Sequence, residues 1–325
     1  MRFPQNTRRA LRGTTALLGA LAILPAAAHA AAPTVATGGA TKISPQSATL
    51  NGTVNPRSKD TAYFFQYGPT VAYGAQTPDI GAGAGTVNAA AAADVIGLSP
   101  ATTYHFRLVA RNADGTTTGG DRSFKTANQP LGFTLEASPN PVLFGAGVTL
   151  QGVLSGTGNA GRQVALQQSP FPYATGFVTV GNPQVTGSSG AFSFPLLGVT
   201  TNTQYRTITT AGPSVASAIV TLGVAVQVTT RVSTHRLHAG HLVRFSGIVR
   251  PAKVGALFAI QKLNGAGAWV TVSGGVARGG GGTFTRFAKR VRVRRSGSYR
   301  VYVGVADGMQ VSNTGPVELI KVRRR

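Results

Sequence analysis

The chain has 325 residues and a formal net charge of +23, because 31 Lys and Arg residues face only eight Asp and Glu residues. It contains no cysteine, which excludes disulfides, cysteine nucleophiles and zinc–thiolate sites. Hydrophobic residues make up 42% of the chain, which is enough for packed cores, and the length predicts two or three domains of roughly 100–200 residues.

The first thirty residues have the pattern of a signal peptide. Four arginines accompany an apolar run from Thr14 to Pro25, and Ala28-His29-Ala30 is a small-x-small cleavage site. The run is shorter than the ~20 residues of a membrane span. We therefore predict a signal peptide over 1–30 and no membrane span in the mature chain, with an uncleaved anchor as the alternative. Arg8-Arg9 also fits a twin-arginine signal, so the export route stays open.

The mature chain shows short runs in which apolar and polar residues alternate, separated by Gly, Pro, Asn and Ser. This pattern predicts antiparallel β-sandwich domains. We place a linker over 31–40 and domains over 41–127, 131–222 and 227–325.

The segment 41–127 contains the run from Leu98 to Asn112, LSPATTYHFRLVARN, followed by Asp114-Gly115. It matches the pattern L-x-P-x-T-x-Y-x-F/V-x-V-x-A-x-N-x-x-G and resembles the fibronectin type III family. The resemblance implies a seven-stranded sandwich with structural roles for Leu98, Pro100 and Tyr104. Tyr104 stands where the family has its tyrosine corner. The resemblance says little about function, because this fold has many roles.

The rest of the chain contains an internal repeat of about 93 residues. The matched pairs are Val164-Ala165-Leu166-Gln167 with Phe258-Ala259-Ile260-Gln261, Phe177 with Trp269, Phe192 with Phe284, and Tyr205-Arg206 with Tyr299-Arg300. This order of motifs resembles the tandem immunoglobulin-like domains of bacterial surface proteins, less closely than the first resemblance. It implies two further sandwiches.

Catalytic chemistry finds little support in the sequence. Glycosidase chemistry needs two positioned carboxylates, and the few acids of the mature chain lie mainly in turn contexts. We therefore predict a protein that is not an enzyme and has no cofactor. His235, His238 and His241 form the only candidate metal cluster, but with arginines around it and no carboxylate near it in the sequence we expect an exposed loop without metal.

The charge is concentrated at one end. Residues 227–325 hold eighteen basic and two acidic groups, net +16, whereas 31–130 and 131–226 carry only +2 and +1. Within the last segment, Lys289 to Arg295 reads KRVRVRR, so a strand would align arginines on one face. Such a row suits a polyanion. The residues predicted to make this contact are Arg286, Arg290, Arg292, Arg294, Arg295, Arg323, Arg324 and Arg325.

The sequence thus predicts a secreted or extracellular binding or adhesion module, with cell-wall association as one option. Its cationic C-terminal domain would associate with an anionic cell-wall polymer or another polyanion. One alternative is a structural spacer without a ligand, in which the arginines provide solubility. Another is a carbohydrate-binding accessory protein of an extracellular enzyme system, which would use exposed aromatic residues. The candidates for such a sugar site are Tyr67, Tyr73, Phe171, Tyr173 and Trp269.

Overall fold

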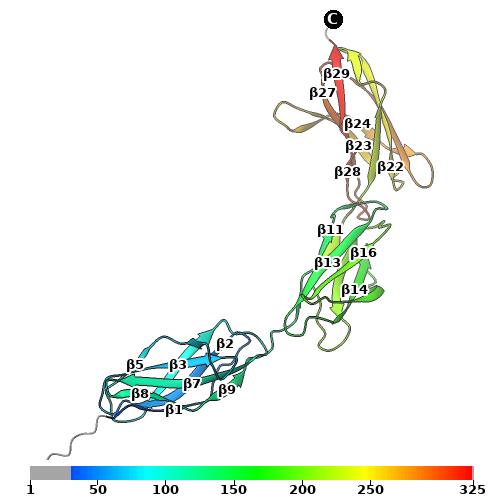
Figure 1. Ribbon diagram of the computed structural model, residues 1–325. Coiled ribbons are helices and arrows are strands. Elements are labelled where there is room, and N and C mark those ends of the chain that lie inside the picture. Colours follow the sequence, from blue (N-terminus) through cyan, green and yellow to red (C-terminus); the bar gives the residue numbers. More distant parts are fainter. Residues whose placement is uncertain (1–30, 324–325) are drawn as a thin grey trace, which may run out of the picture. The chain divides into compact units, whose positions relative to one another are not determined.

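A computed structural model describes residues 31–323 (Figure 1). All secondary-structure elements in this part of the chain are β-strands, so the all-β prediction is confirmed. The predicted signal peptide over 1–30 and the last two residues, Arg324 and Arg325, lie outside the described residues. Nothing in the described chain forms a helix with the length and apolar character needed to span a bilayer.

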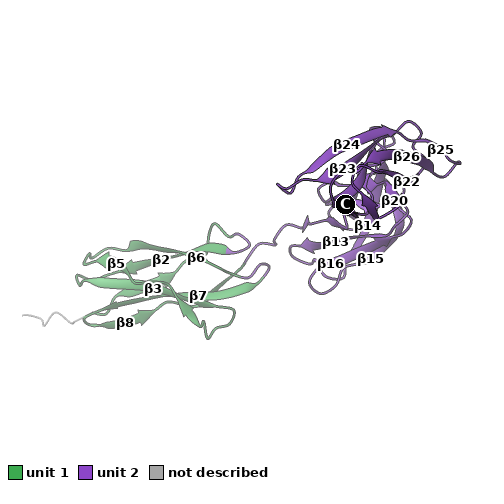
Figure 2. Ribbon diagram, turned by 90° about the horizontal axis from the view of Figure 1, so that it is seen from above, with its two compact units in different colours: residues 1–43, 47–98, 102–125 green, residues 44–46, 99–101, 126–325 purple. Residues whose placement is uncertain are grey.

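The strands form two compact units, green and purple in Figure 2. The first contains Ser47–Leu98 and Thr102–Lys125 together with the strand before them, and the second runs from Thr126 onward. Buried apolar side chains form one cluster in the first unit and two in the second. The domain boundaries near 127–131 and 222–227 stay predictions.

Two antiparallel sheets form the first unit, in the orders β1-β2-β6 and β4-β3-β7-β8, with β5 beside β3 and β9 beside β7. Leu50, Phe65 and Phe106 are fully buried between them. The strands are β1 (Thr34–Thr37), β2 (Ser47–Asn55), β3 (Thr61–Gly68), β4 (Ala75–Gln76), β5 (Ile80–Gly83), β6 (Ala89–Ile96), β7 (Thr103–Asn112), β8 (Gly115–Thr118) and β9 (Arg122–Lys125).

The residues of the fibronectin-like motif surround the start of β7. Leu98 and Tyr104 are buried, and Pro100 lies in the turn before the strand. The ring of Tyr104 stacks on Phe124 of β9, with the two centroids 5.9 Å apart. Burial of an aromatic pair of this kind stabilises the contact between neighbouring strands.

The prediction of a linker over 31–40 is wrong, because β1 lies within it and pairs with β2. Val35 packs against the core, and Thr37 is buried with its Oγ1 accepting a hydrogen bond from the Leu108 amide at 3.1 Å. A four-residue strand has too few alternating positions to be recognised from its sequence. Its pairing partner, which is distant along the chain, makes it a strand.

The second unit contains two sandwiches. The sheets of the first of these, which we call the middle sandwich, have the orders β10-β13-β11, with β16 beside β13, and β15-β14-β17-β18. Its strands are β10 (Gly132–Phe133), β11 (Glu136–Ser138), β12 (Val142–Leu143), β13 (Val148–Ser155), β14 (Gln163–Pro170), β15 (Val178–Val185), β16 (Ala191–Leu196), β17 (Thr203–Thr209), β18 (Val220–Leu222) and β19 (Val224–Ala225).

The other, the C-terminal sandwich, has sheets in the orders β20-β22-β26-β25 and β21-β29-β27-β23-β24, with β28 beside β27. Each sandwich of this unit also has one short parallel pair, β12 with β19 and β21 with β29. The strands of the C-terminal sandwich are β20 (Gln227–Val232), β21 (Arg236–His238), β22 (Leu242–Arg250), β23 (Leu257–Leu263), β24 (Trp269–Val276), β25 (Arg278–Gly279), β26 (Thr285–Arg292), β27 (Gly297–Gly304), β28 (Asn313–Thr314) and β29 (Glu318–Arg323).

A glycine on β13 of the middle sandwich and one on β22 of the C-terminal sandwich define their common register. Gly152 lies opposite Phe192, and Gly247 lies opposite Phe287. Phe192 therefore corresponds to Phe287, and its predicted match with Phe284 is wrong by three residues. The mismatch arises because the connection before β26, which contains the glycine run 279–282, is longer than the connection before β16.

A hydrogen-bonded junction joins the middle and C-terminal sandwiches. Asn202, which is only 8% exposed, accepts a hydrogen bond at Oδ1 from the Val224 amide at 2.7 Å. Its Nδ2 donates to the Gly308 carbonyl at 2.8 Å, and its amide donates to the Met309 carbonyl at 2.8 Å. One buried side chain thus satisfies backbone groups on both sides of the junction.

We expect Asn202→Ala to lower the free energy of unfolding by about 2 kcal/mol or more, because the buried amide of Val224 and the half-buried carbonyl of Gly308 lose their partners. Urea denaturation followed by the fluorescence of the single tryptophan, Trp269, measures this. Asn182, exposed on β15, is the control, and Asn182→Ala should change the free energy by less than about 0.5 kcal/mol. If Asn202→Ala changes the free energy of unfolding as little as Asn182→Ala does, the junction contributes nothing to stability.

Candidate anion-binding surface

The outer face of the sheet β20-β22-β26-β25 collects arginines because buried apolar and exposed basic residues alternate along parts of β22 and β26. On β26, Arg290 and Arg292 are exposed while Val291 between them is buried in the core. On β22, Arg244 is exposed between the buried Val243 and Phe245. Side chains two residues apart on a strand share a face, so burial of the apolar set places the arginines in solvent.

Strand pairing places these arginines directly opposite one another. Arg244 pairs with Arg290 across β22 and β26, and Arg278 pairs with Arg286 across β25 and β26. Like charges at directly opposed positions of an antiparallel pair destabilise the sheet. The opposed arginines therefore lower the stability of the sheet, and an anion placed over them would relieve their repulsion.

The same face contains a groove of about 710 Å³. Ser246, Gly247, Phe258 and Phe287 are among the uncharged residues that line it. The cations that line the groove come from four strands or their ends: Arg231, Arg244, Arg278, Arg286 and Lys289.

No carboxylate lines this groove, and the two acidic residues of the C-terminal sandwich have partners elsewhere. Asp307 forms an ion pair with Lys253. Glu318 accepts a hydrogen bond at Oε2 from His235, with the two atoms 2.9 Å apart. The positive charge of the groove is thus uncompensated within the sandwich, and it favours an external anion.

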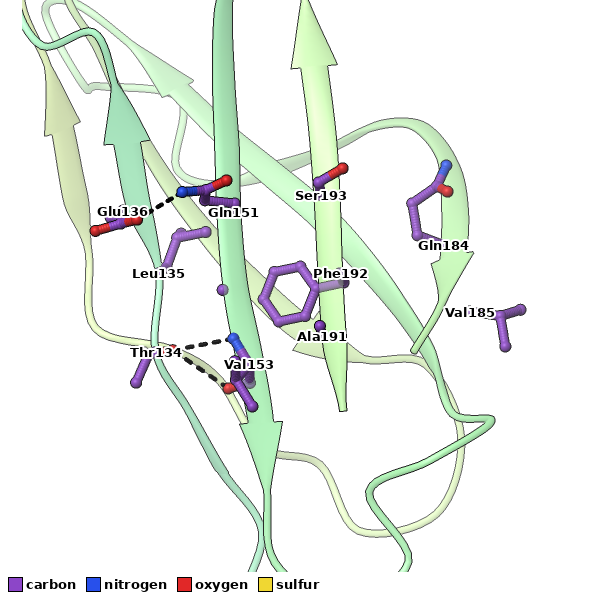
Figure 3. A pocket seen from close by; sticks show the side chains of 11 residues that line it. Thr134, Leu135, Glu136, Gln151, Val153, Gln184, Val185, Ala191, Phe192 and Ser193 are labelled. Carbon is purple, nitrogen blue, oxygen red and sulfur yellow. Dashed lines mark hydrogen bonds between the residues drawn. The ribbon is translucent and has the colours of Figure 1, made fainter. Parts of the chain in front are cut away.

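The middle sandwich has a groove at the equivalent place, of about 820 Å³ (Figure 3). At its edge the Thr134 hydroxyl accepts a hydrogen bond from the Val153 amide at 2.9 Å, as the Thr229 hydroxyl does from the Ile248 amide at 3.3 Å. The register relates the positions Glu136 and Arg231, Thr149 and Arg244, and Ala191 and Arg286.

The two grooves therefore have the same strand register but linings of different charge. In the middle sandwich the charged lining residue is Glu136, whose Oε1 accepts a hydrogen bond from Gln151 Nε2 at 2.7 Å. The fold accounts for the hollow, since both sandwiches have it. The arginines are a separate property of the C-terminal sandwich, and folding does not require them.

The structure separates the arginines that the sequence grouped together. Arg286, Arg290 and Arg292 lie on β26 of the sheet β20-β22-β26-β25, where Arg292 Nη1 donates to the Gly240 carbonyl at 3.2 Å. Arg294 and Arg295 follow the end of β26 and line a smaller hollow of about 350 Å³.

Arg323 ends β29, a strand of the opposite sheet, so it does not contribute to the groove. Three groove arginines were missed by the sequence analysis: Arg231, Arg244 and Arg278. The alternation of Val243, Arg244 and Phe245 was a usable signal for one of them. The other two depend on which strands become neighbours.

The three histidines of the cluster do not converge. His235 Nε2 lies 2.9 Å from Glu318 Oε2, so the expectation that no carboxylate lies near the cluster is wrong. Glu318 is 83 residues away in sequence, and strand β29 brings it there. The rings of His238 and His241 lie 6.2 Å apart. Among residues 31–323, no three His, Cys, Asp or Glu side chains come close enough to hold a metal ion.

Three of the five aromatic residues considered for a sugar site have another group against one side of the ring. The Arg107 guanidinium lies 4.7 Å from the ring centroid of Tyr73, and the Arg300 guanidinium lies 4.3 Å from that of Trp269. Phe171 packs against the backbone at Gly308, where an added Cβ would approach the ring to 2.5 Å. Flat sugar stacking needs an open ring face, and these contacts occupy one face of each ring.

No family model matches the chain, and no curated protein matches it. Among solved structures it is similar to the FN1–FN3 domains of chicken CNTN1, with 14% identity, coverage of 88% of this chain and 98% of that chain, and a TM-score of 0.31. It is similar to tandem domains from titin, with 14% identity, coverage of 89% and 99%, and a TM-score of 0.37. A third similar structure is a tetra-tandem repeat in the extending region of a large adhesion protein, with 16% identity, coverage of 89% and 74%, and a TM-score of 0.27.

Proposed function

We propose that this chain is an exported, non-catalytic binding module of the cell envelope or extracellular space, and that its C-terminal sandwich holds an anionic polymer in the groove over β20, β22, β26 and β25. We further propose that the first sandwich, which includes β1 and so begins before residue 41, is a fibronectin type III domain and that the two later sandwiches are immunoglobulin-like. The fibronectin-like motif and the arrangement of the sheets in each sandwich support these assignments.

One observation carries the function. Two sandwiches with the same groove differ in that one lines it with five cations and the other has a single charged residue, Glu136. The cationic lining includes the opposed pair Arg278 and Arg286, which lowers stability when no anion is bound. Guanidinium groups present planar donor edges to phosphate or carboxylate oxygens, so the chemistry fits a polymer with repeated negative charges.

The test is the binding of the full chain, after removal of residues 1–30, to teichoic acid and to DNA over a range of salt concentrations. Neutralising about four phosphates of a flexible chain gives a log–log slope of about −3. Affinity should then fall about 10³-fold between about 0.05 M and about 0.5 M salt. An affinity that does not change with salt, or no binding to either polymer in low salt, would refute the proposal and favour a spacer without a ligand.

A further inference from the structure

One carboxylate oxygen of the first sandwich is buried without a partner. Asp114 lies in the turn between β7 and β8, and its Oδ2 atom is shielded from solvent with no hydrogen bond or ion pair to any residue of 31–323. Among the acidic residues of this part of the chain, only Asp114 has such an oxygen. A buried carboxylate oxygen without a donor costs free energy, so the position calls for a cation or an N–H group.

The turn itself is held by another side chain. An aspartate in a tight turn usually accepts a hydrogen bond from a nearby backbone amide. Here Asn112 has that role, because its Oδ1 accepts from the Asp114 amide at 2.9 Å. Asn112 also pairs with Gly115 where β7 meets β8. Asp114 Oδ2 is therefore not needed to form the turn.

The same tripeptide, Ala-Asp-Gly, recurs in the C-terminal sandwich at 306–308 and shows what such an oxygen can hold. It follows β27, which pairs with β23, as the tripeptide of Asp114 follows β7, which pairs with β3. Asp307 Oδ1 accepts from the Met309 amide at 3.0 Å, and its Oδ2 pairs with the ammonium group of Lys253. In the first sandwich the oxygen is present and the ammonium is missing.

The basic side chains around this turn do not supply the missing cation. The loop between β2 and β3, which reaches the turn through a hydrogen bond to the Pro56 carbonyl, holds Arg57 and Lys59. Both are exposed, and neither forms an ion pair within residues 31–323. Arg111, at the end of β7, pairs with Asp79 instead.

The first residues that the structure describes lie beside the turn. Asn112 Nδ2 donates to the Ala31 carbonyl at 3.4 Å, while Oδ1 of the same side chain binds the Asp114 amide. On the other side of Asp114, a Cβ added to Gly115 would lie 3.3 Å from Ala32 Cβ. The residues on both sides of Asp114 thus contact residues 31 and 32, which brings the backbone nitrogen of Ala31 into its neighbourhood.

Ala31 is also the residue at which the sequence predicts the mature chain to begin. Hydrolysis of the Ala30–Ala31 peptide bond by a signal peptidase consumes one water molecule. It leaves a carboxylate on Ala30 and an α-ammonium group on Ala31. Before hydrolysis this nitrogen is an uncharged amide, whereas afterwards it has three N–H donors and a positive charge, as the Lys253 side chain does beside Asp307.

We propose that Asp114 receives the α-ammonium group of Ala31, so that removal of the signal peptide completes the first sandwich. The inference rests on the export that we propose for this chain. β1 begins three residues after Ala31 and is the outer strand of the sheet β1-β2-β6. The ion pair anchors this strand at its start, and the processed chain holds β1 more tightly than the precursor does.

The first test is an NMR measurement of the pKa of the Ala31 α-amino group in the chain 31–325, prepared with Ala31 as its first residue. A carboxylate nearby stabilises the ammonium form, so we expect this pKa to lie above its ordinary range of about 7.7–8.0. Asp114→Asn should return it to that range. Asp60→Asn, which changes an exposed aspartate of the neighbouring loop, should leave it raised. Equal pKa values in the three chains would overturn the proposal.

The second test compares this chain with one that carries Gly-Ser-Gly before Ala31, which moves the ammonium group away from the turn. The Gly38 amide, just after β1, donates to the Asn51 carbonyl at 2.8 Å, so its hydrogen exchange reports the opening of β1. At about pH 6.5, Asp114→Asn should speed this exchange roughly tenfold in the chain that begins at Ala31. In the extended chain the change should be less than about threefold.

The effect should also depend on pH in a defined direction. The raised pKa belongs to a group that is charged when protonated, so its stabilisation is complete below about pH 7.7 and is lost as the pH rises through the raised value. The ratio of the exchange rates with and without Asp114→Asn should therefore fall toward one in alkaline solution.

Two outcomes would contradict the proposal in different ways. An equal effect of Asp114→Asn in the two chains would show that Asp114 acts only within its turn. Mass spectrometry of the exported protein that finds a first residue other than Ala31 would overturn the processing step. Neither result bears on the salt-dependent binding of a polymer by the groove, so the two proposals fail separately.

Discussion

Replacing Arg231, Arg244, Arg278 and Arg286 together with glutamine is expected to lower the affinity for teichoic acid at least about 100-fold in low salt. These residues line the same groove from β20, β22, β25 and β26. Each phosphate that an arginine neutralises releases a counterion, and the variant loses this contribution to binding. The salt dependence should weaken in parallel, because fewer charges take part in binding. Affinity measured at several salt concentrations gives both quantities.

The matched control removes the same amount of charge from exposed positions of the first sandwich, Lys42, Lys59, Arg122 and Lys125. It should change the affinity less than about threefold, since these exposed charges do not line the groove and charges that do not contact the polymer are largely screened. The groove variant should also be at least as stable as the natural chain, because it removes the opposed arginines. If both variants lose affinity equally, net charge and not the groove binds the polymer.

Gly247→Ala is expected to destabilise the C-terminal sandwich by about 3 kcal/mol or more. A Cβ at this position would lie 1.8 Å from the Thr229 carbonyl oxygen and 2.5 Å from Phe287 Cζ. The backbone of β20 cannot move away without losing its pairing with β22, and Phe287 is buried in the core. Urea denaturation followed by Trp269 fluorescence measures the loss.

Two further glycines complete this test. Gly152→Ala should cause a similar loss in the middle sandwich, where a Cβ would lie 2.0 Å from the Thr134 carbonyl oxygen. Gly282→Ala, in the loop before β26 with nothing within 4 Å of an added Cβ, should change stability by less than about 0.5 kcal/mol. A Gly247→Ala chain as stable as the Gly282→Ala chain would contradict the register that aligns the two grooves.

Much of the local structure could be predicted from the sequence because strand side chains alternate with a period of two. The run from Lys289 to Arg295 predicted that Val291 and Val293 face the core, and both are buried. Leu98 and Tyr104 of the fibronectin-like motif are both buried. The repeat pairs Gln167 with Gln261 and Arg206 with Arg300 also match in the structure, because the paired strands β14 with β17 and β23 with β27 keep the same register.

Other features depend on which strands become neighbours, and alternation carries no information about that. Arg231 and Arg278 join the groove only because β20 and β25 are the outer strands of the sheet that contains β22 and β26. Gln66 and Arg107, 41 residues apart, are hydrogen-bonded because β3 pairs with β7. The alternation of apolar residues along each strand therefore determined which side chains are buried. The tertiary structure alone decided which exposed side chains meet, because cross-strand register is set by contacts between residues far apart in the sequence.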